Sequence, residues 1–181
     1  MFGDPVTNNK HLKKLPLSEL LKFKSGDFLP ATAMAENGIY PVFGGNGVNG
    51  HHDKFMFIEP KIIVGRVGVY CGCVHVSPAK SWVTDNALYV SERSSQLNFD
   101  YLAFSLRQAK LNQYASQSAQ PLISGARLYP IEILLPPIEN QQDFTAKATA
   151  AEELKVNHLT SIAELDTLFA SLQHRAFRGE L

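Results

Sequence analysis

The last quarter of the chain repeats its seam residues at alternating spacings of four and three positions for more than four heptads. This period is typical of a coiled-coil helix. It predicts one continuous helix from about residue 139 to residue 177, roughly 58 Å long at 1.5 Å per residue. The seam positions are Phe144, Ala148, Ala151, Lys155, His158, Ile162, Leu165, Phe169, Leu172 and Ala176. Lys155 and His158 lie in the middle of the seam, where polar residues usually fix register and partner choice.

The length of this helix limits what can cover its seam. The preceding part of the chain is too small to cover such a rod from end to end. The seam is therefore predicted to pair with a helix of a second copy or of another subunit, and a homodimer is the expected form. A helix that folds back on its own head is the alternative.

Pro136 and Pro137 mark the predicted boundary between two domains, because a double proline prevents a helix from running back through it. After Ile138 there is no further proline, and no glycine before Gly179. The predicted domains are residues 1–137 and residues 138–181.

Residues 1–137 alternate short β-rich runs with turn signals, which predicts an α+β fold of short strands with one or two helices laid across them. Strands are expected at 39–43, 55–58, 61–70, 73–76, 82–83, 86–90 and 128–135. A helix is expected at 99–108, with Asn98 as its cap. Segment 15–23 suits either a short helix or the lead-in to a strand, and the glycine-rich segment 44–50 is expected to be a loop.

Charge and hydropathy restrict the class of partner. Over the whole chain 17 Lys and Arg balance 17 Asp and Glu, but residues 1–137 hold 13 basic and 10 acidic residues, and no acid lies between Asp100 and Glu132. This asymmetry is compatible with a polyanionic partner. No apolar run approaches the ~20 residues of a membrane span, and the amino-terminal residues lack the apolar core of a secretory signal. We therefore expect no membrane partner and a cytoplasmic location.

Three local patterns resemble parts of enzymatic sites. Gly44–Gly50 resembles a phosphate cradle, but no Lys-Ser/Thr pair follows it. Cys71, Cys73 and His75 lack the paired spacing of a zinc site. Strand alternation would place all three on one face, where the cysteines are predicted to be buried structural thiols. His51, His52 and Asp53 have no accompanying nucleophile. No catalytic residue and no metal site is predicted, and a binding protein is favoured over an enzyme.

Seven short motifs follow one another in an order that is specific to one family. They are Phe23-Lys-Ser-Gly26, Tyr40-Pro-Val-Phe-Gly-Gly-Asn-Gly-Val-Asn-Gly50, Lys61-Ile-Ile-Val-Gly-Arg-Val-Gly68, Trp82-Val-Thr-Asp-Asn-Ala-Leu-Tyr-Val90, Ser118-Ala-Gln-Pro-Leu-Ile-Ser124, Leu134-Leu-Pro-Pro-Ile-Glu-Asn-Gln141 and Arg175-Ala-Phe-Arg-Gly-Glu-Leu181. Gln117 stands where the family usually has glycine. Together these motifs resemble one half of the DNA-specificity subunit of type I restriction-modification systems.

This resemblance implies a non-catalytic DNA-binding specificity subunit with one target-recognition domain and one long dimerisation or spacer helix. Such a domain reads one half of a bipartite target in double-stranded DNA, and the helix holds two domains apart. The expected protein partners are the methyltransferase (modification) subunit and the restriction subunit. No cofactor is expected on this chain, because S-adenosylmethionine, ATP and Mg would belong to those partners. The chain is either a natural half-subunit or the second half of a longer product.

Polar side chains near the predicted loops are the candidate DNA contacts, since Asn and Gln pair with adenine and Arg pairs with guanine. Base contacts are predicted at Asn46, Asn49, His51, His52, Arg66, Ser118 and Gln120. Phosphate contacts are predicted at Lys13, Lys14, Lys54, Lys80, Lys110 and Arg127. Each of these residues also has a structural alternative. Arg66 could form an ion pair, and Ser118 and Gln120 could brace the loop before Pro121. His51 and His52 could be polar surface residues.

Two functions of other classes are the alternatives to this prediction. The first is a small phosphate-ligand-binding enzyme that uses the Gly44–Gly50 loop, which would show turnover without added subunits. The second is a purely structural coiled-coil assembly protein, which would have no affinity for DNA.

Overall fold

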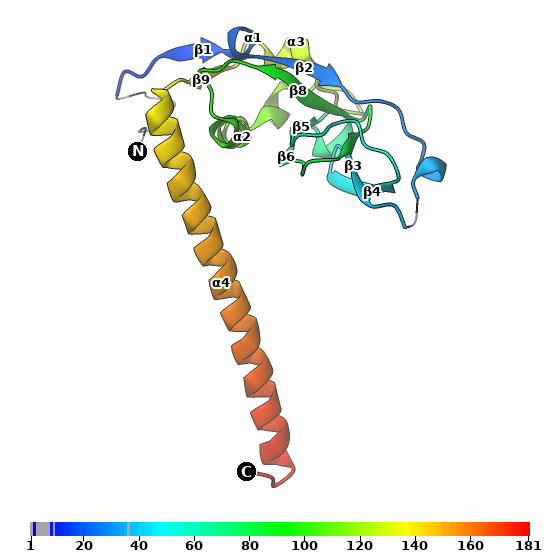
Figure 1. Ribbon diagram of the computed structural model, residues 1–181, viewed down its shortest axis with the longest axis vertical. Helices are drawn as coiled ribbons and strands as arrows, with labels where there is room; N and C mark the ends of the chain where they lie inside the picture. Colours follow the sequence, from blue (N-terminus) through cyan, green and yellow to red (C-terminus); the bar gives the residue numbers. More distant parts are fainter. Residues whose placement is uncertain (1, 3–7, 9, 36) are drawn as a thin grey trace. The chain divides into compact units, whose positions relative to one another are not determined.

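The computed structural model describes residues 2, 8, 10–35 and 37–181 (Figure 1). Two compact units divide the chain: the first ends at Gln141 and the second runs from Gln142 to Leu181. The first unit therefore includes the first turn of the long helix, one turn beyond the double proline. The mixture of short strands and helices, followed by a single long helix, confirms the predicted fold class.

A four-stranded antiparallel sheet forms the larger part of the first unit. Its strands are β2 (Leu21–Ser25), β8 (Ala87–Arg93), β5 (Ile62–Gly65) and β6 (Val74–Val76), in that spatial order. All four residues of β5 are buried, because this strand lies inside the sheet with covered faces. The predicted strand at 61–70 is thus too long, since the chain leaves the sheet after Gly65 and makes the 3-10 turn η2 (Gly68–Tyr70).

A three-stranded sheet packs beside it, with β3 (Tyr40–Gly44) between β4 (Gly47–His52) and β7 (Trp82–Val83). Strands β3 and β4 are antiparallel, whereas β3 and β7 are parallel. Residues of both sheets share one core cluster, Phe43, Ile63, Val83 and Ala87, with Phe57 and Tyr89 packed against it. The strand predicted at 55–58 is wrong: among these residues only Phe57 pairs, in an isolated bridge with Ser81.

Segment 15–23 contains both of the structures that its sequence suggested. Strand β1 (Lys14–Pro16) leads into the one-turn helix α1 (Leu17–Leu20), and β2 follows directly. β1 pairs antiparallel with β9 (Glu132–Leu134). The strand predicted at 128–135 is therefore shorter than expected, because Leu128 closes the one-turn helix α3 (Gly125–Leu128).

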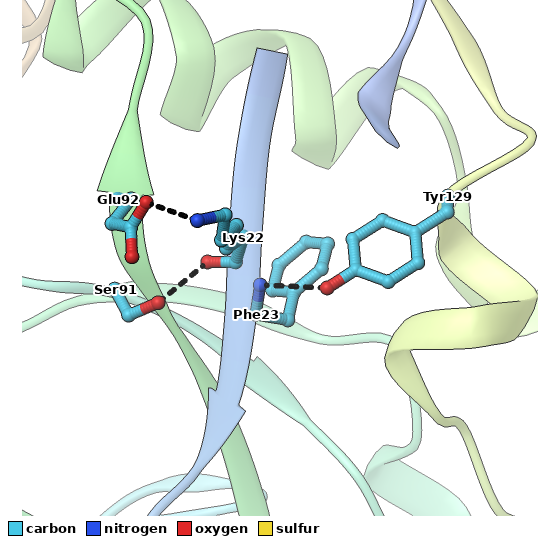
Figure 2. Close-up of polar contacts among 5 residues, drawn as sticks. All are labelled: Lys22, Phe23, Ser91, Glu92 and Tyr129. Carbon is cyan, nitrogen blue, oxygen red and sulfur yellow. Dashed lines mark hydrogen bonds and ion pairs between the residues drawn. The ribbon is translucent and has the colours of Figure 1, made fainter. Parts of the chain in front are cut away.

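The outer edge of β2 is covered by a side chain rather than by another strand. The backbone N–H of Phe23 donates a hydrogen bond to the hydroxyl of Tyr129 at 3.2 Å, as Figure 2 shows. On the other side of β2, Lys22 and Glu92 form an ion pair at 2.6 Å across the β2–β8 ladder. Their bond raises the pKa of Lys22 and lowers that of Glu92. The bond from Phe23 to Tyr129 thus satisfies one backbone N–H of this edge strand.

Helix α2 (Phe99–Gln108) begins where the sequence predicts it. The side chain of Asn98 accepts hydrogen bonds from the backbone N–H groups of Asp100 and Tyr101, both at 3.0 Å, and so caps the helix. The hydroxyl of Tyr101 donates to the carbonyl of Leu134 at 2.9 Å and ties α2 to β9. Two further 3-10 turns, η1 (Ala31–Ala33) and η3 (Leu111–Tyr114), lie in the connections.

The long helix α4 (Ile138–Phe177) starts from a buried polar joint in the first unit. Gln141 has no exposed surface. Its side-chain amide donates to the carbonyls of Gln96 and Pro136 at 2.9 and 2.8 Å, and its oxygen accepts the N–H of Asn98 at 2.8 Å. The first turn of α4 is therefore bonded to the residue that caps α2.

Candidate nucleic-acid interface

The glycine-rich segment 44–50 is a β-hairpin and not the predicted loop. Gly44 pairs with Gly47, so Gly45 and Asn46 lie at the tip of the turn. The positive φ of 92° falls on Gly47, the residue after the tip, as in hairpins where a left-handed glycine follows a type I turn. Gly47–Gly50 belong to β4, whose backbone groups pair with β3. Because those groups are engaged in the ladder, the segment is not an open phosphate cradle, and the structure gives no support to an enzyme built on it.

The hairpin displays three of the seven candidate base contacts. Asn46, Asn49 and His51 are exposed. Asn49 lies over Gly44, where a Cβ would stand 2.1 Å from its Nδ2, so the strand needs glycine beneath this side chain. His52 is half-buried instead, and its ring meets the Trp82 ring edge-on at 5.4 Å.

Arg66 lies at the end of β5 and is already engaged. Its Nη1 donates to the hydroxyl of Ser25 at 3.1 Å and to the carbonyl of Asp85 at 3.3 Å. Its backbone N–H donates to Asn86, and its carbonyl accepts the N–H of Ile123. These bonds make Arg66 a brace between β2, the β7–β8 turn and the loop before α3, with a hydroxyl and a carbonyl as partners in place of the alternative ion pair.

Ser118 and Gln120 belong to the loop 116–123, which is held by its own side chains. The hydroxyl of Ser118 donates to the carbonyl of Gln120 at 2.6 Å and lies 3.0 Å from the hydroxyl of Ser116. Ser116 in turn accepts the N–H of Leu122 at 2.9 Å. Ser118 therefore braces the loop, while both it and Gln120 remain exposed.

The six candidate phosphate contacts do not gather in one patch. Lys13 and Lys14 lie at the β1–β9 pair, at the opposite end of the domain from the β3–β4 hairpin (Figure 1). Lys54 follows β4, and Lys80 lies in the turn before β7. Lys110 ends α2. Five of the six are exposed, and Lys14 is half-buried.

Arg127, in α3, borders a polar hollow that the sequence did not reveal. Its guanidinium donates to the carbonyl of Tyr114 at 3.4 Å. The hollow has a volume of about 480 Å³ and is lined by Gln113, Tyr114, Ala115, Gln117 and Arg127. Its walls come from the end of η3, from Ala115 and Gln117 directly after it, and from α3.

Cys71, Cys73 and His75 do not share one strand face, so this prediction is wrong. The turn η2 precedes Cys71, and only His75 lies in β6. Cys71 is buried and its thiol donates to the carbonyl of Arg66 at 3.1 Å, whereas Cys73 is exposed. Within the described residues no three His, Cys, Asp or Glu side chains are grouped so that they could hold a metal ion.

His75 packs against the hairpin turn. A Cβ at Gly47 would stand 3.4 Å from its ring. Burial lowers the pKa of His75, and the positive charge of Arg107 lowers it further, while a hydrogen bond to the Gly45 backbone opposes both effects. A neutral His75 therefore supports the turn that carries Asn46. The sequence carries no signal for the contact between His75 and Gly47, because the two residues lie far apart in the chain.

The seam of α4 is exposed from Ala148 onward, whereas Phe144 is half-buried. Every residue from 146 to 181 is exposed, including Ile162 at 54%, Leu165 at 64% and Phe169 at 65%. Leu154 and Leu168 are also exposed apolar residues of this helix, although they do not occupy predicted seam positions. No helix among the described residues is both long and apolar enough to cross a membrane.

The comparisons with known proteins point to one family. The family described as Type I restriction modification DNA specificity domain matches residues 9–148. The specificity subunit of the type I restriction enzyme EcoprrI from Escherichia coli is 33% identical over 133 residues, which cover 71% of this chain and 33% of that protein.

Two solved structures are similar in fold. The S subunit of a type I restriction-modification system from M. genitalium has a TM-score of 0.70 at 20% identity, covering 87% of this chain and 43% of that one. A chain solved in a study of complex assembly and conformational transition of the type I R-M system has a TM-score of 0.65 at 20% identity, covering 93% and 46%. This chain thus spans from one third to just under one half of these relatives. Since the family match includes both the strand-rich domain and the start of α4, the chain belongs to the type I restriction-modification DNA specificity domain family.

Proposed function

We propose that this chain is a non-catalytic specificity subunit that reads one half of a bipartite DNA target in the cytoplasm. The observation that carries the proposal is the family match over residues 9–148, which spans the recognition domain and its junction with α4. The exposed side chains of the β3–β4 hairpin support it, because Asn side chains can pair bidentately with adenine. The chain itself would need no cofactor, since S-adenosylmethionine, ATP and Mg would act on the partner subunits.

The proposed protein partners are the methyltransferase and restriction subunits of a type I system. The curated relative is the specificity subunit of a type I restriction enzyme, and one solved relative comes from work on assembly of the type I R-M complex. Coexpression of the chain with the cognate methyltransferase subunit, followed by genome-wide mapping of methylated adenines, tests this function. We expect methylation at one bipartite motif, and methylation without any common motif would contradict the proposal.

A second copy of the chain is the proposed partner of the α4 seam. The chain spans less than half of each solved relative, so two copies would supply the length of one such subunit. In an antiparallel homodimer a two-fold axis relates the two recognition domains. The target should then be palindromic, with two identical half-sites separated by a non-specific spacer of fixed length.

Deleting Glu152 to His158 should shorten the spacer of the recognised motif. The deletion removes one whole heptad, so the phase of the seam is kept while the helix shortens by roughly 10 Å, or about three base pairs. Methylation mapping of both versions should return the same half-sites at a shorter separation. An asymmetric motif would contradict the homodimer, whereas an unchanged spacer would contradict only the role of α4 as a ruler.

Gln120→Ala and Lys54→Ala should separate base reading from phosphate binding. Loss of a bidentate contact from Gln120 should reduce discrimination between target and random duplex by about 1–3 kcal/mol. Loss of Lys54 should weaken both duplexes about equally and reduce the salt dependence of binding by about one charge. Titrations of both duplexes at several salt concentrations measure these effects. Equal losses on target and random DNA for Gln120→Ala would assign that residue to the loop brace instead.

A further inference from the structure

The turn η2 displays a bare apolar side chain at its tip. Val69 is 88% exposed, more than any other large hydrophobic residue described in the first unit. Its neighbour Tyr70 is 46% exposed. A single exposed valine on a mobile loop would need no explanation, but this one stands on a fixed backbone.

Backbone hydrogen bonds fix the residues before and after Val69 in η2. The N–H of Gly68 donates to the carbonyl of Pro121 at 2.9 Å, and the carbonyl of Gly68 accepts the N–H of Cys71 at 3.0 Å. The N–H of Gly72 donates to Gly65 at 2.8 Å. Gly68 adopts a φ of 75°, a conformation that strains any residue with a side chain. The positive φ of Gly68 and these hydrogen bonds thus fix the backbone that presents Val69.

Three connections meet around this turn, and we call them the three-loop surface: the hairpin turn Gly45–Gly47, the turn Gly68–Tyr70 and the loop 116–123. A Cβ at Gly65 would lie 2.5 Å from the carbonyl of Gly45 and 2.3 Å from that of Tyr70, so the first two connections touch across one glycine. Val67 pairs with Leu122 in an isolated bridge, which joins the third. The candidate base contacts Asn46 and Gln120 belong to the same surface.

The three-loop surface itself contains no charged residue, and the longer stretches that include two of its connections contain basic residues but no acidic ones, with Asp85 directly after the first stretch. Residues 60–84 and 101–131 contain no Asp or Glu, whereas they contain Lys61, Arg66, Lys80, Arg107, Lys110 and Arg127. Such a balance suits a polyanion and disfavours a basic protein surface. A rigid apolar tip among uncharged polar residues, in a part of the chain with more basic than acidic residues, suits a polyanionic ligand that also offers an apolar group.

We propose that Val69 contacts the C5-methyl group of a thymine in the major groove and is a specificity-determining residue. The thymine methyl is the apolar group that a base edge presents in that groove, and small aliphatic side chains are suited to pack on it. Hydrogen bonds from the polar members of the three-loop surface would read the neighbouring base edges. This inference rests on the proposed DNA-binding function and adds to it a residue and the chemical group that it recognises.

A methyl-deletion experiment with the full-length chain tests the contact. The target duplex is selected by the chain from a random pool and resynthesised with each thymine replaced in turn by deoxyuridine, which lacks only the methyl group. At one position the replacement should weaken binding by the wild-type chain about fourfold, the effect of exposing one methyl group. Val69→Ala should weaken binding to the thymine duplex by a similar factor and should be indifferent to the replacement.

Ile58→Ala is the matched control, because Ile58 is another aliphatic residue of the same domain and is 73% exposed. It should keep both the affinity and the methyl effect. A wild-type chain indifferent to every replacement, or a Val69→Ala variant that still senses the methyl group, would overturn the inference while leaving the DNA-binding function intact. A Val69→Ala variant with unchanged DNA binding and lost methyltransferase binding would assign Val69 to a protein contact. A wild-type chain that binds no duplex would overturn the proposed function itself.

Discussion

Gln141→Glu should destabilise the recognition domain by roughly 3 kcal/mol or more at neutral pH. The carboxylate would face the carbonyls of Gln96 and Pro136, to which the native amide donates, at a site with no exposed surface. Each buried group left without its partner costs about 1–3 kcal/mol, and an uncompensated buried charge adds to this cost. Chemical denaturation followed by circular dichroism measures the change in the free energy of unfolding.

Gln142→Glu is the control for this prediction, since it makes the same chemical change at the next residue, which is exposed. It should leave stability within about 0.5 kcal/mol. The deficit of Gln141→Glu should also shrink near pH ~4, because burial raises the pKa of a carboxyl and a protonated Glu can donate one of the two lost bonds. A Gln141→Glu variant as stable as the wild type at neutral pH would show that this joint contributes nothing to stability.

Replacing Ile162 and Leu165 together by lysine should convert the protein from a dimer to a monomer. Both residues are exposed seam positions, 54% and 64% accessible in the single chain. In an antiparallel pair of helices they would be buried against the partner, and each copy would bring two unpaired charges into the seam. Light scattering at tens of micromolar should give the mass of two chains for the wild type and of one for the variant.

Thr160→Lys with Ser171→Lys adds the same two charges to the opposite face of α4, where both residues are exposed. This control should remain dimeric. A wild-type chain that is monomeric at about this concentration would contradict the homodimer, as would a seam variant that still dimerises. In the first case the seam would need a helix from another protein.

Periodicity and capping made the helices predictable. The four-three spacing predicted α4 to within a residue of its observed start, and Asn98 marked the start of α2. Both signals are local. A capping side chain accepts a hydrogen bond from an N–H two or three residues further on, and seam residues three or four positions apart lie on one helix face, so neither depends on distant parts of the chain. The short strand β7 at Trp82–Val83 was also predicted, because this β-rich pair continues the spacing of the short strands before it.

Glycine composition misled the prediction where tertiary contact decides the structure. Gly47–Gly50 are strand residues because they pair with β3 and because Asn49 occupies the space above Gly44. A residue count cannot distinguish glycines that permit close packing from glycines that permit flexibility. The contacts of the candidate site were unpredictable for the same reason. Arg66 meets Ser25 and Asp85 only after three distant segments fold together.

The bonded joint at Gln141 also bears on where a recognition domain could be grafted onto another helix. All three partners of its amide, Gln96, Asn98 and Pro136, lie in the same compact unit as Gln141 itself. A recombination event that joins the recognition domain of one chain to the helix of another would preserve this joint if the crossover falls after Gln141. A crossover at the double proline would instead leave the joint dependent on whether the incoming helix brings a glutamine at the same position. New DNA specificities should therefore arise most readily from grafts that carry the first helical turn with the domain.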